Sequence, residues 1–148
     1  MTSEEIQALL GAQRAFFNSG ATLSVDFRIK SLRKLYDAVK AHEGDIHAAL
    51  TADLGKSAYE GFMCESGLAL TEVSYMIKHT RKLARRKTVR TPLAQFASHS
   101  FTQAMPYGNT LVMSPWNYPF LLTIDPLADA IAAGNTVILK PSAYSPAT

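Results

Sequence analysis

The stretch covering residues 110–145 constrains the fold most, because two short apolar runs flank a longer apolar segment there. The runs 110–113 and 136–139 are rich in β-formers, and Gly134-Asn135 closes the segment between them. This pattern is typical of a parallel β-α-β unit in which both strands are buried. The sequence therefore predicts an α/β fold whose ligands bind beyond the carboxyl ends of these two strands.

The composition supports one globular domain and argues against several other classes of protein. With 148 residues and 47% hydrophobic side chains, the chain is long enough to bury a sizeable core. Its apolar runs are far shorter than the roughly 20 residues that a membrane-spanning helix needs. Its amino terminus also lacks the apolar core of a signal peptide. We therefore predict a cytoplasmic protein with no membrane segment, and its single cysteine, Cys64, fits a reducing compartment.

Nucleic-acid and metal sites are disfavoured by the spacing of the charged and metal-binding residues. A basic cluster closes a predicted helix whose carboxyl end favours cations, and it lacks interleaved aromatic residues, so we expect no nucleic-acid partner. The cluster consists of Lys78, Arg81, Lys82, Arg85, Arg86, Lys87 and Arg90. The four histidines show no metal-ligand spacing with Cys64, which we interpret as a packed thiol, and no metal site is predicted.

The first half of the chain is predicted to be helical. Thr2 and Glu5 form a capping box ahead of an amphipathic helix that ends near Gly20. Ser24 is the predicted cap of a second helix, and Gly44 would supply its left-handed end.

Two more helices and an exposed strand are predicted before the β-α-β unit. Asp45 would cap a third helix that ends near Gly55, and a fourth covers residues 57–85. The inner face of the fourth helix would carry Tyr59, Phe62, Met63, Leu70, Val73 and Ile77. Residues 98–105 alternate loosely and predict a strand with one exposed face, of the kind that pairs with another sheet or subunit. The chain thus divides into residues 1–97, 98–109 and 110–148.

The connection after the first strand of the β-α-β unit carries a candidate catalytic amide. Pro119 suits a first helical turn, which places Asn117 at a helix amino terminus. A side-chain amide beside free backbone N–H groups can stabilise negative charge on a carbonyl oxygen, as an oxyanion hole does. Asn at a helix start is more often a simple cap, so the residues alone leave both roles open.

The second strand ends at a candidate nucleotide-binding residue. Lys140 can donate hydrogen bonds to ribose hydroxyls or phosphate at the strand edge, although a lysine that reaches from a buried strand into water gives the same pattern. Trp116 can wall a pocket or fill the core. Neither strand is followed by a Gly-rich phosphate-binding motif.

Three motifs together resemble the aldehyde dehydrogenase superfamily. They are Pro115-Trp116-Asn117-Tyr118-Pro119, Ala132-Ala133-Gly134-Asn135 and Val137-Ile138-Leu139-Lys140-Pro141-Ser142. The amino-terminal helices look most like the class 3 branch, through Phe27-Arg28-Ile29, Ala52-Asp53-Leu54-Gly55-Lys56 and Tyr75-Met76-Ile77. The resemblance implies helices that pack on the first β-α-β unit of a dinucleotide-binding domain, with residues 98–105 in a bridging sheet through which family members dimerise.

The resemblance also implies roles for individual residues. Asn117 would be the oxyanion-hole amide, and Tyr118 and Leu122 would face an aldehyde tunnel. The nicotinamide side of a cleft for NAD or NADP would be lined by Met113, Ser114, Pro115 and Trp116. The adenosine ribose would contact Lys140 and Ser142.

The resemblance finally implies a reaction that this chain cannot complete by itself. Family members oxidise aldehydes to carboxylic acids through a cysteine thiohemiacetal, and class 3 enzymes act on medium- and long-chain or aromatic aldehydes. Their catalytic cysteine and general-base glutamate correspond to nothing in these 148 residues, so we expect an amino-terminal portion that is inactive alone. The alternatives are a non-catalytic association protein and an acyl or phosphoacyl reductase on the same fold.

One position departs from the family pattern in a way that bears on the cofactor. Many relatives place a glutamate after Lys-Pro-Ser, where it can bind both ribose hydroxyls and repel a 2′-phosphate, but this chain has Ala143. Lys140 would then be an uncompensated cation beside the ribose. We therefore expect the enzyme to accept NADP, and NAD as well.

Overall fold

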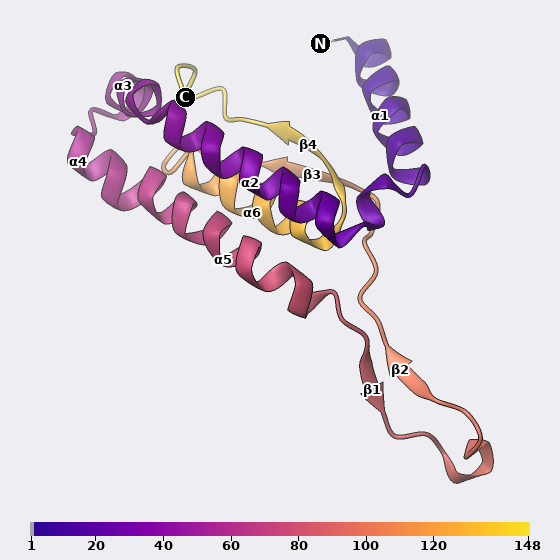
Figure 1. The fold of residues 1–148 in the computed structure, drawn as a ribbon. Helices are drawn as coiled ribbons and strands as arrows, with labels where there is room; N and C mark the ends of the chain where they lie inside the picture. Colours follow the sequence, from indigo (N-terminus) through magenta and orange to yellow (C-terminus); the bar gives the residue numbers. More distant parts are fainter. Residues whose placement is uncertain (1) are drawn as a thin grey trace.

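The computed structural model describes residues 2–148, and its helices stack against a small parallel sheet (Figure 1). The helices are α1 Ser3–Asn18, α2 Val25–Ala41, α3 Glu43–Leu54, α4 Ala58–Gly61, α5 Gly67–Leu83 and α6 Leu121–Ala133. The strands are β1 Lys87–Val89, β2 Ser100–Thr102, β3 Asn109–Met113 and β4 Thr136–Lys140. Helices α2, α5 and α6 share one apolar core, formed by Leu32, Ala69, Val73, Ile124, Ala128 and Ala132.

The predicted β-α-β unit is confirmed, and with it the fold class. Strands β3 and β4 pair in parallel from Asn109 opposite Thr136 to Met113 opposite Lys140, and α6 connects them. The predicted burial of both strands is wrong, because Leu139 of β4 is 39% exposed, and Leu111 and Met113 of β3 are 60% and 65% exposed. Alternate side chains of a strand point to opposite faces, and these two lie on a face that no described residue covers.

The first helix boundaries follow the predicted capping chemistry. The Thr2 backbone N–H donates to Glu5 Oε2 at 2.7 Å, and the Glu5 N–H donates to Thr2 Oγ1 at 3.3 Å, which completes the capping box. Gly20 follows α1 with φ of 76°, and Ser24 Oγ accepts the Phe27 N–H at the start of α2. The amino-terminal boundaries are therefore confirmed.

The predicted junction between the second and third helices is wrong. Helix α2 ends at Ala41 and α3 starts at Glu43, so His42 alone makes the turn, with φ of −108°. Gly44 and Asp45 lie inside the first turn of α3, and Asp45 Oδ2 contacts His42 Nδ1 at 3.0 Å. An acidic side chain is favourable there because it faces the positive end of the helix dipole.

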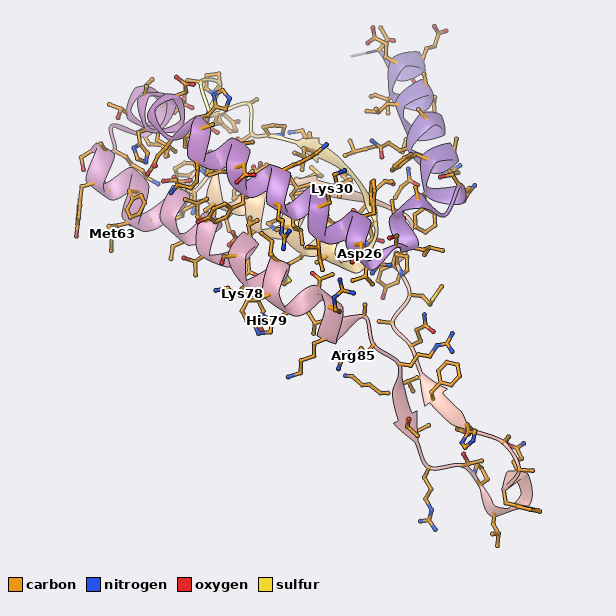
Figure 2. The ribbon with its side chains drawn as sticks, viewed as in Figure 1. Asp26, Lys30, Met63, Lys78, His79 and Arg85 are labelled. Carbon is orange, nitrogen blue, oxygen red and sulfur yellow. The ribbon has the colours of Figure 1, made fainter. Side chains whose placement is uncertain are left out.

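The predicted fourth helix contains an interruption that the sequence did not reveal. Residues Phe62–Ser66 form a π-helix between α4 and α5, here called the π-turn. Leu70 and Val73, after the π-turn, are buried as predicted. The inward placement of Tyr59, Phe62 and Met63 is wrong: they are 76%, 42% and 49% exposed, and Met63 points away from the bundle in Figure 2.

A two-stranded arm projects from the body after α5 (Figure 1). The predicted strand over 98–105 is present as the shorter β2, which pairs antiparallel with β1. Strand β1 was not predicted, because Lys87 was assigned to the basic helix end.

Figure 2 shows Lys78 and Arg85 on the side of α5 away from α2, as expected for a solvated helix end.

Neither of two further kinds of site is found in residues 2–148. No helix among them is both long and apolar enough to span a bilayer. No group of three or more His, Cys, Asp or Glu side chains is gathered there as metal ligands would be.

Candidate active site

The two predicted corners of the site lie side by side at the carboxyl ends of β3 and β4. Met113 is the register partner of Lys140, and the Ser114 N–H donates to the Lys140 carbonyl oxygen at 3.2 Å. The parallel register therefore joins the segment that follows β3 to the segment that follows β4, as expected for the ligand edge of an α/β sheet.

The residues of this edge differ in exposure. Met113 and Trp116 are 65% and 55% exposed, so Trp116 does not fill the core of the described residues. Pro115 is exposed beside them. Ser114 is buried, and its Oγ has no hydrogen-bond partner among residues 2–148. The buried hydroxyls of Thr22, Thr136 and Ser145 also lack partners among these residues, so Ser114 is distinguished by its place at the corner where a ligand is expected.

The side of the edge that β4 contributes is open to solvent. Lys140 is exposed, and its Nζ donates at 3.4 Å to the neighbouring Pro141 carbonyl oxygen, a bond at the long limit of the usual range. Ser142 is half-buried, and its Oγ accepts the Tyr144 N–H at 3.2 Å. Lys140 therefore keeps donors for a ligand phosphate or hydroxyl.

Asn117 lies on an exposed bend ahead of α6 rather than at its cap. The N-cap residue of α6 is Phe120, and no side chain of its own segment caps the helix. The interpretation of Asn117 as a helix cap is therefore wrong. The Tyr118 carbonyl oxygen accepts the Leu122 N–H at 3.0 Å, and these two side chains are 40% and 39% exposed.

The amino terminus of α6 is capped by a residue from a distant helix. Glu65, in the π-turn, is fully buried, and its Oε2 accepts the Phe120 N–H at 2.9 Å and the Leu121 N–H at 3.1 Å. A carboxylate at this position satisfies free donors and faces the positive end of the helix dipole. The amide of Asn117 is therefore not needed for capping.

A buried lysine links this carboxylate to the bend. Lys56 is 8% exposed, and its Nζ pairs with Glu65 Oε1 at 2.5 Å. The same Nζ donates to the Asn117 carbonyl oxygen at 3.3 Å and lies 4.2 Å from the centroid of the Tyr118 ring. Lys56 and Glu65 together hold both ends of the 117–121 segment.

Sequence reasoning did not assign any role to Lys56 or Glu65. Lys56 belongs to one of the motifs that resemble class 3, and Glu65 lies within the helix predicted over residues 57–85. A usable signal was present, because Glu65 and Ser66 are adjacent polar residues in an otherwise apolar helical stretch. Neighbouring residues are about 100° apart on a helix and can both be buried, as Ala69 and Leu70 are in α5, so this signal marks a buried polar pair but reveals neither the π-turn nor the partner of Glu65.

An acidic cluster lies apart from this edge, between α5 and α6. Desolvation, and then the charges of Glu72 and Asp129, raise the pKa of Asp125 to about 6. Desolvation also raises the pKa of Glu72 and of Asp129. These shifts describe an electrostatic cost of folding, and none of the three residues is among the predicted site residues.

Known proteins resemble this chain over its whole length. A family profile described as "Aldehyde dehydrogenase family" matches residues 1–148. The chain is 43% identical over 133 residues to the 4,4'-diaponeurosporen-aldehyde dehydrogenase of Staphylococcus aureus, covering 90% of this chain and 29% of that protein. It is 41% identical over 142 residues to the "Aldehyde dehydrogenase, dimeric NADP-preferring" of Canis lupus familiaris, covering 95% and 31%. Further relatives are named as family 3 aldehyde dehydrogenases.

A solved structure shares the fold closely. The structure titled "Substrate bound state of Staphylococcus Aureus AldH" superposes with a TM-score of 0.93 at 41% identity, covering 96% of this chain and 31% of that one. The chain therefore spans about 30% of the length of the relatives that it matches.

Proposed function

The chain belongs to the aldehyde dehydrogenase family. We propose that it supplies the oxyanion donor and part of the cofactor-binding site of an enzyme that oxidises aldehydes, both at the carboxyl edge of β3 and β4. The substrates are medium- and long-chain or aromatic aldehydes, and the products are carboxylic acids. The nucleophilic cysteine and the general base come from sequence outside these 148 residues. The observation that carries this proposal is that Asn117 is exposed. Its side-chain amide is not needed to cap α6, because Glu65 accepts the first N–H groups of that helix.

The first role in this proposal belongs to the Asn117 amide. When a cysteine thiolate adds to an aldehyde, negative charge develops on the former carbonyl oxygen. A prearranged N–H donor stabilises that charge more than it stabilises the neutral aldehyde, and the barrier to addition falls as a result. Tyr118 and Leu122, which project partly exposed from the same turn, would border the aldehyde chain.

The remaining residues of the edge would hold the cofactor. The unpartnered Ser114 hydroxyl and the free donors of Lys140 fit a polar ligand at this corner. Met113, Pro115 and Trp116 would pack against the nicotinamide side, while Lys140 and Ser142 would bind the adenosine ribose. Bound NAD or NADP supplies the acceptor for hydride.

The decisive experiment replaces Asn117 by alanine in the complete enzyme that contains this chain. Single-turnover measurement of acylation should show a rate lower by about 10²–10³, equivalent to roughly 2.7–4 kcal/mol. A denaturant melt should show little change in stability. An unchanged acylation rate rejects the catalytic role of Asn117.

Asn135→Ala is the matched control. Asn135 is buried, and its Oδ1 accepts the Gly108 N–H at 3.0 Å. Its loss should lower the free energy of unfolding by about 1–3 kcal/mol, because a buried donor is left unsatisfied, and should leave acylation nearly unchanged.

We further propose that residues 98–109 belong to a homodimer contact and that the enzyme is cytoplasmic. Within this range Phe101 and Met105 are 48% and 66% exposed, and the tip of the same arm carries Leu93 and Phe96 at 88% and 83%. Exposed apolar side chains on a projecting hairpin favour association. Sedimentation of the complete enzyme with and without Phe101→Glu, on β2, tests this contact, and a dimer of unchanged affinity contradicts it.

A further inference from the structure

Glu65 is an unusual choice for capping a helix, because it reaches α6 from 55 positions earlier in the chain. Helices α1 and α2 are capped by the local hydroxyls of Thr2 and Ser24. A local cap of this kind would satisfy the N–H groups of α6 without burying a charge. The buried Lys56–Glu65 pair therefore needs a reason other than capping alone.

Stability does not supply that reason. Removing two charges from water costs several kcal/mol per ion, and a well-packed apolar pair of similar volume is often as stable. What the pair does provide is a fixed geometry. Its hydrogen bonds reach the 117–121 segment at three backbone atoms: Lys56 donates to the Asn117 carbonyl oxygen, and Glu65 of the π-turn accepts from the nitrogens of Phe120 and Leu121.

Glu65 reaches this segment from within the π-turn. Glu65 and Ser66 are adjacent members of the π-turn, and both are fully buried. Gly67 makes room for the turn, since a Cβ at that position would lie 2.7 Å from the Phe62 carbonyl oxygen. A bulkier residue would force the turn to shift.

We propose that Lys56 and Glu65 are positioning residues for the Asn117 oxyanion donor. Lys56 holds the Asn117 carbonyl oxygen and the Tyr118 ring, and Glu65 holds the first turn of α6, so the exposed Asn117 amide projects from a backbone fixed on both sides. A displacement of about 1 Å at a reacting group can lower a rate by up to about 10²-fold. This inference rests on the proposed role of Asn117.

The test is a double-mutant cycle in the complete enzyme. Lys56→Met with Glu65→Gln removes both charges while keeping similar volumes and leaving a carbonyl oxygen to accept the α6 N–H groups. The pair of substitutions is made with Asn117 present and with Asn117→Ala, and acylation is measured by stopped flow. We expect a loss of at least about tenfold with Asn117 present and no further loss in the Asn117→Ala enzyme.

Ser66→Ala is the matched control, because Ser66 is equally buried in the same π-turn but bonds to His47 Nε2 at 3.0 Å. It should lower the melting temperature and leave acylation unchanged. If the paired substitution prevents folding, Lys56→Arg keeps the cation but changes the donor geometry at Asn117. It should slow acylation at least about threefold, again only when Asn117 is present.

The outcomes separate the inference from the function on which it rests. If Asn117→Ala slows acylation but the Lys56 and Glu65 variants do not, or if the two losses multiply, the positioning role is overturned and the oxyanion role stands. If Asn117→Ala leaves acylation unchanged, both are overturned.

Discussion

Gly134 lies directly against the guanidinium of Arg28. A Cβ at position 134 would meet Arg28 Cζ at 2.6 Å, and Gly134 has φ of 94°. Arg28 is 7% exposed, and desolvation lowers its pKa from the ordinary value. It donates to the carbonyl oxygens of Thr22 at 2.7 Å and Ala132 at 3.3 Å, so it ties the start of α2 to the end of α6.

Gly134→Ala should therefore lower the free energy of unfolding by about 2 kcal/mol or more, through backbone strain and displacement of Arg28. Gly11→Ala is the control, since Gly11 lies inside α1 with open space around it. That change should raise stability by about 0.5–1 kcal/mol. Urea melts measure both, and equal stability of the Gly134 variant and the parent contradicts the contact.

Asp125→Asn should increase stability in a pH-dependent manner. The pKa of Asp125 is about 6 in the folded protein against an ordinary 3.8, so the folded state binds more protons between these values and loses stability as pH rises through them. Removing this carboxyl should add on the order of 1 kcal/mol above pH 6, after allowing for solvent screening, and almost nothing near pH 4.

Melts of this variant and the parent from pH 4 to 7.5 measure that difference. Asp37→Asn, at an exposed position of α2, provides the comparison for loss of a charge in the absence of burial. A stability difference that stays flat across this range contradicts the assignment.

Ala143→Glu should shift cofactor preference in the complete enzyme. A carboxylate after Ser142 would repel a 2′-phosphate and bind the ribose hydroxyls of NAD. The ratio of kcat/KM for NADP over NAD should fall by at least about tenfold, or roughly 1.4 kcal/mol. Ala143→Gln, which adds similar bulk without charge, should shift it less. A parent that strongly prefers NAD, and is unaffected by the glutamate, shows that position 143 does not choose the cofactor.

The 148-residue chain alone should not oxidise aldehydes. Its one cysteine, Cys64, lies in the π-turn rather than at the ligand edge of the sheet. An oxyanion donor has no effect on rate without a nucleophile to form the tetrahedral adduct. Absorbance at 340 nm reports reduction of NAD or NADP. Aldehyde-dependent reduction that disappears in Cys64→Ser contradicts this prediction.

The sequence predicted those features that depend on neighbouring residues. The capping box of Thr2 and Glu5, the helix ends near Gly20 and Gly55, and the β-α-β unit around Gly134 all follow from local chemistry, and all are confirmed. The predicted helix end at Gly44 is wrong. The residues around Gly44 are compatible both with the end of one helix and with the first turn of the next, so the local sequence does not distinguish the two.

The remaining features depend on register or on distant contacts. The extra residue of the π-turn rotates the residues after it by about 100° relative to those before it. A helical wheel drawn through residues 57–85 as one regular helix therefore assigns the residues before the turn to the wrong face. Tyr59 and Met63 were placed inside for this reason. Lys56 and Glu65 meet the bend before α6 only in the folded chain, so no local pattern could assign them to Asn117.

Because the shared core takes residues from α2, α5 and α6, it can be completed during synthesis only after α6 has been made. Leu32 and Val73, from α2 and α5, pack against Ala128 of α6, which is made much later. The amino-terminal helices can therefore leave the ribosome before their third partner exists. Until α6 emerges, we expect α2 and α5 to pack on each other while the apolar surface that α6 will cover stays exposed, so the nascent chain completes its core only after residue 133 has been made.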